Sequence, residues 1–147
     1  ISHAIAFLLE RAKIIVEGAG AMPVAALLSG KLRVENEPVV AVISGGNIDL
    51  TLLSRIIMHE LARDGRLVSI IGEVYDRPGE LKKVLDIIAQ YGLNVFDIKH
   101  ERWNPDILPN KALVEITIEC GDPGILEKVL SDLRKEGYNF NLQRRLR

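Results

Sequence analysis

The first 65 residues carry the hydrophobic pattern of helices that alternate with short strands. Apolar residues recur at the spacing of one helix face and predict helices over 1–13, 23–28 and 49–63. Two wholly apolar runs, 14–16 and 39–43, are typical of strands that are buried on both faces. Strands that alternate with helices indicate a parallel α/β layer. Because two strands make a poor sheet, the pattern predicts an incomplete α/β segment.

Small and polar residues mark the turns of this half. Turns are expected at 17–21, which reads Glu-Gly-Ala-Gly-Ala, and at 44–47, which reads Ser-Gly-Gly-Asn. The helix that follows the second turn can be capped by Asp49 or by Thr51. No capping residue precedes the first helix, which suggests a chain cut from something longer, or else a trimmed end.

After Gly65 the pattern changes to longer, alternating strands. The clearest strand is the third, in which Val114, Ile116 and Ile118 alternate with polar residues. Two amphipathic helices are predicted, one ending near Tyr91-Gly92 and one near Gly137. The predicted strands are 67–74, 94–102, 113–119 and 138–142. The order βαββαβ indicates a ferredoxin-like split βαβ arrangement. The predicted fold class is therefore α+β, with a domain over 66–147 that follows the incomplete α/β segment over 1–65.

The strand pattern also predicts self-association. The strand at 67–74 is expected at an edge of the sheet, where pairing with its twin would cover free backbone groups. The incomplete α/β half would leave apolar helix faces uncovered. A homodimer or a higher homo-oligomer is expected.

Composition and charge exclude several classes of function. Lysine and arginine total 19 against 20 acidic residues, which argues against a dedicated nucleic-acid binder. No apolar run approaches the roughly 18 residues of a membrane span. The single cysteine, Cys120, excludes an internal disulfide framework, fits a reducing cytosol, and is interpreted as a packed thiol. The three histidines lack the HExxH spacing, so no metal centre is predicted.

One motif in the second half resembles that of ACT domains. The motif is Asp76-x-Pro-Gly-Glu-Leu after a strand, followed by Gly92-Leu-Asn94 at the start of the next strand. The resemblance covers about residues 66–143 and implies a regulatory module that binds an amino acid, often between two paired domains. The candidate effector-binding residues are Asp76, Pro78, Gly79 and Asn94.

The chemistry of these residues is compatible with that use. A helix N-terminus presents free N–H groups and partial positive charge, and Gly79 lets a ligand carboxylate approach the backbone there. Asn94 offers both a donor and an acceptor. The alternative is purely structural: Asp76 caps the helix, Pro78 and Gly79 form a turn, and Asn94 opens a strand.

Two segments of the first half resemble the C-terminal part of the catalytic domain of threonine/serine dehydratases. They are Glu10–Ala21, which reads ERAKIIVEGAGA, and Val39–Asp49, which reads VVAVISGGNID. These dehydratases are pyridoxal-phosphate enzymes of the tryptophan-synthase-β fold type. Followed by an ACT domain, the segment resembles the tail of the threonine ammonia-lyases. The resemblance implies a lyase of amino-acid metabolism that converts L-threonine to 2-oxobutanoate and ammonia. It also implies allosteric regulation by an aliphatic amino acid such as isoleucine or valine.

The same resemblance implies cofactor contacts. The family's counterpart of Ser44 bonds the pyridine nitrogen of pyridoxal phosphate, and a neutral hydroxyl there suits β-elimination over transamination. Gly45 and Gly46 would let the backbone pass close to the ring, Asn47 would brace the turn, and Glu17 matches a glutamate near the cofactor. Without the resemblance, these residues form an ordinary strand-to-helix turn and a solvated carboxylate.

The chain departs from the dehydratases in one large respect. The family's Schiff-base lysine and glycine-rich phosphate loop lie N-terminal of the matched region, and Lys13 and Lys31 match no such motif. Covalent catalysis needs that lysine, so this chain alone is expected to be inactive and to hold no cofactor, with no catalytic residue of its own.

Other interpretations of the chain remain open. The main alternative is a stand-alone ACT-type module for amino-acid binding or dimerisation with no enzymatic role. A ferredoxin-like nucleic-acid binder is disfavoured because the strands lack aromatic positions for base stacking. His59 and His100 are interpreted as surface or interface residues, and the arginines at 144, 145 and 147 as a solvated tail.

Overall fold

A computed structural model of the chain describes residues 1–32, 34–35 and 37–143, so the expected arginine tail lies outside the described residues. The chain divides into two compact units, unit 1 (Ile1–Leu61) and unit 2 (Ala62–Arg147). No helix among the described residues is both long and apolar enough to cross a membrane.

Unit 1 is built from short helices around a small apolar core. Its elements are α1 (Ser2–Phe7), the π-helical turn η1 (Leu8–Ala12), α2 (Met22–Leu28) and the start of α3 (Leu50–Arg63). The predicted first helix is therefore present, but its second half is a π-helix that ends at Lys13 with a φ of 60°. The buried core residues are Ala4, Ile5, Leu8, Val16, Ala21, Leu53 and Ile56.

The predicted strands 14–16 and 39–43 are wrong, because neither segment forms a β-strand. Val16 is fully buried, but Val40 is 86% exposed and Val42 is 71% exposed. The two segments meet at their ends, where the Glu17 N–H donates to the Gly45 carbonyl at 3.1 Å. A strand needs a continuous ladder of such bonds, and the described residues of unit 1 supply no further strand to pair with either run.

Helix α3 shows which cap forms and which residues lie inside. The side chain of Asp49 accepts a hydrogen bond from the Leu52 N–H at 2.9 Å, so Asp49 is the cap. The predicted apolar face is only partly correct. Leu52, which was expected to be buried, is half-exposed, and the charged residue Glu60 is buried. The carboxylate of Glu60 lies 3.0 Å from Nδ1 of His3.

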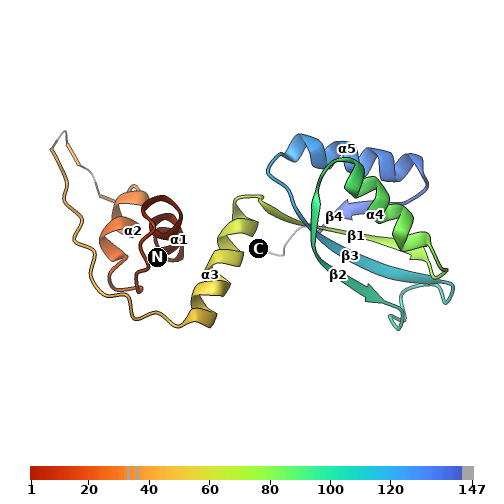
Figure 1. Cartoon of the computed structure of the whole chain (residues 1–147), viewed down its shortest axis with the longest axis horizontal. Coiled ribbons are helices and arrows are strands. Elements are labelled where there is room, and N and C mark those ends of the chain that lie inside the picture. Colours follow the sequence, from red (N-terminus) through yellow and green to blue (C-terminus); the bar gives the residue numbers. More distant parts are fainter. Residues whose placement is uncertain (33, 36, 144–147) are drawn as a thin grey trace. The chain divides into compact units, whose positions relative to one another are not determined.

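Unit 2 has the predicted βαββαβ order and one antiparallel sheet, with helices α4 and α5 on the same face (Figure 1). The third strand buries alternate residues, as its sequence predicts. Its elements are β1 (Leu67–Tyr75), α4 (Glu80–Gln90), β2 (Asn94–Glu101), β3 (Lys111–Glu119), α5 (Pro123–Lys135) and β4 (Phe140–Leu142). The ferredoxin-like fold class is thus confirmed.

The strand order corrects one prediction. The sheet runs β2-β3-β1-β4, so β1 lies between two neighbours and is not an edge strand. All nine residues of β1 pair with β3, and Ile70, Ile71 and Gly72 pair with β4. The apolar content of β1 fits this central position, whereas the edge strand β2 is largely exposed. Any pairing between copies through the sheet must use β2 or β4.

The starts of the two helices differ although their sequences are alike. The Asp122 side chain caps α5 by accepting from the Gly124 N–H at 2.8 Å. Helix α4 instead has Gly79 at its N-cap position, with a φ of 90° that glycine tolerates best, and it has no side-chain cap. Asp76 is therefore free for another role.

Candidate functional site

The two glycine-containing turns of unit 1 lie against each other. Gly20 is buried, and a Cβ atom added to it would lie 1.7 Å from the Ser44 carbonyl oxygen. A Cβ on Gly45 would lie 2.1 Å from Oε1 of Glu17. The structure therefore brings the predicted cofactor residues of both turns together, and it requires glycine at these close approaches.

The turn at 44–47 exposes a hydroxyl beside a stretch of glycine backbone. Ser44 and Asn47 are exposed, and the Ser44 hydroxyl has no hydrogen-bond partner among the described residues. A free hydroxyl can donate to a pyridine nitrogen, and Gly45 next to it adds no side-chain bulk. The Ile48 N–H donates to the Gly46 carbonyl at 2.9 Å, which closes the turn without using Asn47.

Unit 2 has a hollow of about 330 Å³ at the β1–α4 loop. The hollow lies between the C-terminal ends of β1 and β2 and the first turn of α4, and it combines apolar and cationic side chains. It is lined by Val74, Tyr75, Asp76, Arg77, Pro78, Leu81, His100 and Arg102. The loop thus places two of the predicted effector residues, Asp76 and Pro78, in one concave site.

An ion pair fastens this loop to the end of β2. Nε of Arg102 lies 3.0 Å from each carboxylate oxygen of Asp76. The structural alternative for Asp76, that its side chain caps the helix, is therefore wrong, since Gly79 takes the cap position. Arg77 lies over the Tyr75 ring at 5.3 Å, so the loop presents a second guanidinium close to the first. The hollow holds two cationic groups and one carboxylate, which favours an anionic ligand group.

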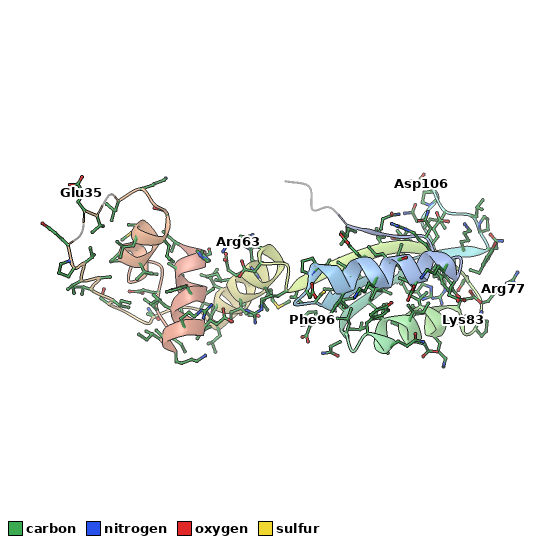
Figure 2. The ribbon with its side chains drawn as sticks, turned by 90° about the horizontal axis from the view of Figure 1, so that it is seen from above. Glu35, Arg63, Arg77, Lys83, Phe96 and Asp106 are labelled. Carbon is green, nitrogen blue, oxygen red and sulfur yellow. The ribbon has the colours of Figure 1, made fainter. Side chains whose placement is uncertain are left out.

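Asn94 is not part of this hollow. It lies at the opposite end of β2, where its Nδ2 donates to Glu119 Oε2 at 3.0 Å. The seven residue steps along β2 to Glu101 span about 23 Å. In Figure 2, Phe96 of β2 and Arg77 of the β1–α4 loop lie at opposite ends of unit 2. Asn94 and the β1–α4 loop of one chain therefore cannot contact the same small ligand.

His100 is the site residue that sequence reasoning missed. It is half-buried rather than exposed, and its Nε2 is enclosed without a hydrogen-bond partner among the described residues. Strict alternation along β2 would place Asn94 and His100 on the same face. A register shift between Val95 and Asp97 instead turns His100 toward the helices, together with Ile98. No motif in the sequence marks that bulge.

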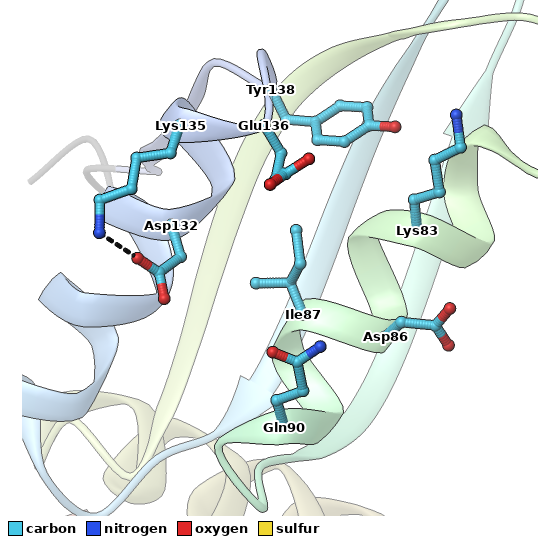
Figure 3. A pocket seen from close by; sticks show the side chains of 8 residues that line it. All are labelled: Lys83, Asp86, Ile87, Gln90, Asp132, Lys135, Glu136 and Tyr138. Atoms are coloured by element: carbon cyan, nitrogen blue, oxygen red, sulfur yellow. Dashed lines mark hydrogen bonds and ion pairs between the residues drawn. The ribbon is translucent and has the colours of Figure 1, made fainter.

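A second hollow, of about 460 Å³, lies between α4 and α5 (Figure 3). Both of its lysines have partners, because Lys135 pairs with Asp132 at 2.7 Å and Lys83 pairs with Glu80 at 2.8 Å. The bond from Lys83, and then that from Tyr138, lowers the pKa of Glu80. Each of these pairs lies within one helix, and both lysines of the hollow are thereby already paired with a carboxylate. No cluster of three or more metal-ligating side chains occurs in the described part of the chain.

Comparison with known proteins identifies relatives over nearly the whole chain. The chain is 43% identical over 142 residues to an L-threonine ammonia-lyase of Thermotoga maritima, a match that covers 97% of this chain and 35% of that protein. It is 37% identical over 138 residues to an L-threonine ammonia-lyase of Geobacter sulfurreducens, covering 94% of this chain and 34% of that protein. The chain thus spans about a third of the length of these relatives.

Solved structures give weaker likenesses. A prephenate dehydratase of Streptococcus mutans matches 52% of this chain and 40% of its own, with a TM-score of 0.45 and 22% identity. The ACT domain of a GTP pyrophosphokinase of Chlorobium tepidum matches 52% of this chain and 95% of its own, with a TM-score of 0.41 and 18% identity. No family model matches the chain. Over nearly its whole length the chain is therefore related to the L-threonine ammonia-lyases, and it corresponds to a C-terminal part of them.

Proposed function

We propose that this chain is the regulatory C-terminal part of a cytoplasmic threonine ammonia-lyase, in which unit 2 senses an amino acid. The observation that carries the proposal is the hollow at the β1–α4 loop, which Asp76 and Pro78 of the motif help to line. The 43% identity to an L-threonine ammonia-lyase supports the metabolic context. The intact enzyme would convert L-threonine to 2-oxobutanoate and ammonia.

The effector is an aliphatic amino acid such as isoleucine or valine. Val74, Pro78 and Leu81 line the hollow and offer contact to a short apolar side chain. A ligand carboxylate would approach the first turn of α4 at Gly79, where no side chain interferes. Asp76 holds the loop through Arg102, and since a carboxylate has about four lone-pair sites, it can still accept from a ligand ammonium.

Asn94 enters the same site through a second copy of the chain. The edge strand β2 offers a row of unpaired backbone groups for antiparallel pairing with its twin. In a pairing centred on the strand, Asn94 of one copy lies beside Glu101 of the other, next to the β1–α4 loop. A homodimer with two equivalent composite sites therefore reconciles the predicted residues with their separation in one chain.

Unit 1 would contribute to a pyridoxal-phosphate site in the intact enzyme. The residues that would hold the cofactor ring are Ser44, through its hydroxyl, and Gly45 and Gly46, through their backbone. Glu17 and Asn47 would support the turn. Pyridoxal phosphate, when bound, would supply the electron sink for elimination of the β-hydroxyl of threonine. This chain alone should release no ammonia from L-threonine with added pyridoxal phosphate, and measurable turnover would contradict that.

Thermal unfolding with each of the twenty amino acids at millimolar concentration tests the sensor function. A ligand at 100 times its Kd adds about 2.7 kcal/mol of stability, which raises the Tm of a domain this size by several degrees. We expect a shift with only one or two aliphatic amino acids. The absence of a shift with all twenty would contradict the sensor function.

A further inference from the structure

The hollow at the β1–α4 loop contains a guanidinium that the protein's own bonds use only in part. Nε of Arg102 lies 3.0 Å from each carboxylate oxygen of Asp76. The terminal nitrogens of Arg102, Nη1 and Nη2, have no hydrogen-bond partner among the described residues. Most of the N–H groups of a guanidinium are on these two nitrogens, so most of its donors remain available.

Arg102 is also within reach of a molecule in the hollow. It lines the hollow together with Asp76, and the side chains of Arg102 and Asp76 are 50% and 35% exposed. The guanidinium is planar and rigid, so the bonds from Nε to Asp76 also hold Nη1 and Nη2 close to that carboxylate. An arginine side chain stays protonated in proteins, so both terminal nitrogens are donors in the unliganded chain.

The ion pair presents the two charges that a free α-amino acid requires. The carboxylate of Asp76 can accept a hydrogen bond from an ammonium, and the guanidinium of Arg102 can donate to a carboxylate. In an α-amino acid the ammonium and the carboxylate are attached to the same carbon atom. A pair of opposite charges side by side in the wall of the hollow therefore matches both ends of the zwitterion.

We propose that Arg102 binds the carboxylate of the amino-acid effector through Nη1 and Nη2, while its Nε stays bonded to Asp76. Arg102 is then a specificity-determining residue, which makes the site discriminate against ligands that lack a free carboxylate. This inference rests on the proposed sensor function and adds to it a residue that the ACT-like motif does not include. The effector also binds directly to the contact that fastens the β1–α4 loop to the end of β2.

The test compares two ligands that differ only in the carboxylate. The amino acid that raises the Tm and its amide (L-isoleucinamide for L-isoleucine, or L-valinamide for L-valine) are titrated into the full chain by isothermal titration calorimetry at pH 7. A hydrogen bond to a charged group corresponds to a factor of about 10 to 100 in affinity. We expect the wild type to prefer the amino acid over its amide by about that factor. We expect Arg102→Gln to lose most of this preference.

The preference separates ligand recognition from a purely structural role. If Arg102 only fastens the loop, Arg102→Gln weakens both ligands by the same factor and the preference stays as it was. The substitution removes an ion pair between partly exposed side chains, which contributes little to stability, so the variant should stay folded. Lys99→Gln is the matched control. Lys99 is on the same strand, pairs with Glu115 at 3.3 Å and does not line the hollow, so both affinities should remain unchanged.

The outcomes separate this inference from the proposed function. If the wild type binds the amino acid and Arg102→Gln keeps the full preference over the amide, the role of Arg102 is refuted and the sensor function stands. A wild type that binds the amino acid and its amide equally well refutes that role in the same way. If the wild type binds none of the twenty amino acids, the sensor function fails, and the inference fails with it.

Discussion

Replacing Gly20 by alanine tests whether contact between the two turns of unit 1 holds their backbones in place. A Cβ at this position would lie 1.7 Å from the Ser44 carbonyl oxygen and 2.7 Å from Cγ2 of Val16. Real Cβ contacts essentially never fall below 3.0 Å, so the two turns must separate. The nearest obstructing atom belongs to the backbone and cannot rotate away.

The expected cost follows from two effects. Overpacking a tight contact costs about 1–3 kcal/mol. Separation of the turns also strains the bond from the Glu17 N–H to the Gly45 carbonyl, which contributes about 1 kcal/mol. Alanine recovers about 0.4–1 kcal/mol by restricting the unfolded chain. We therefore expect Gly20→Ala to destabilise unit 1 by about 2 kcal/mol.

Hydrogen exchange measured by mass spectrometry can detect this loss of stability separately in each peptide of unit 1. A loss of about 2 kcal/mol should speed exchange in peptides that contain the amides of Glu17 and Ile48 about 30-fold. Both amides donate to backbone carbonyls in the two turns or between them. Peptides from the sheet of unit 2, such as β3, should exchange at the wild-type rate, because Gly20 lies in unit 1.

Gly18→Ala is the matched control in the same turn. A Cβ on Gly18 would lie 3.8 Å from Ile1, an ordinary contact, so this variant should be neutral or slightly stabilised. The reasoning is refuted if Gly20→Ala exchanges at the wild-type rate. It is equally refuted if Gly18→Ala accelerates exchange as much as Gly20→Ala does.

Three further predictions concern unit 2. Gly72→Ala should cost about 1–3 kcal/mol in urea unfolding followed by far-UV circular dichroism, because the new Cβ would lie 2.7 Å from the buried Phe140 ring. Asp122→Ala should cost about 1 kcal/mol in the same assay through loss of the α5 cap, and an unchanged midpoint would count against that cap. The bond from Lys135 lowers the pKa of Asp132 in the folded state, so its contribution to stability is present above the unfolded-state pKa and is lost as pH falls through the folded-state pKa. The stability difference between wild type and Asp132→Asn should therefore shrink below about pH 4, and a difference that persists there would contradict this.

The elements of unit 2 were predictable because their patterns are long and local. Residues 113–119 alternate over a whole strand, and the buried residues of α5 recur at helical spacing. The strand order was not predictable in the same way. The placement of β1 between β3 and β4 depends on partners at least 36 residues away, as in the pair Tyr75 and Lys111, which its own apolar pattern does not specify.

The prediction of two strands in unit 1 was wrong for a related reason. An apolar run predicts burial, but a strand exists only where another strand pairs with it. The two apolar runs are linked only where each one ends, by the hydrogen bond from the Glu17 N–H to the Gly45 carbonyl. Val40, in the second run, remains exposed. The contacts made by Gly20 and Gly45, by contrast, agree with the small residues that the sequence places there.

The sequence predicted which loop forms the candidate site, but it did not predict which side chains contact one another there. The motif at Asp76–Gly79 identified the loop, and the hollow lies there. The pairing of Asp76 with Arg102 joins residues on separate elements, which no local pattern reveals. The position of His100 depends on a bulge between Val95 and Asp97, which reverses the alternation along β2.

A titration of the ¹⁵N-labelled chain with L-isoleucine and L-valine, followed by ¹H–¹⁵N NMR, tests the central claim most directly. We predict saturable shifts of the Arg77, Gly79 and His100 amides, which border the hollow at the β1–α4 loop. Shifts concentrated instead at Lys83 and Asp132, in the groove between α4 and α5, would contradict the account. An unchanged spectrum with both amino acids would contradict it as well.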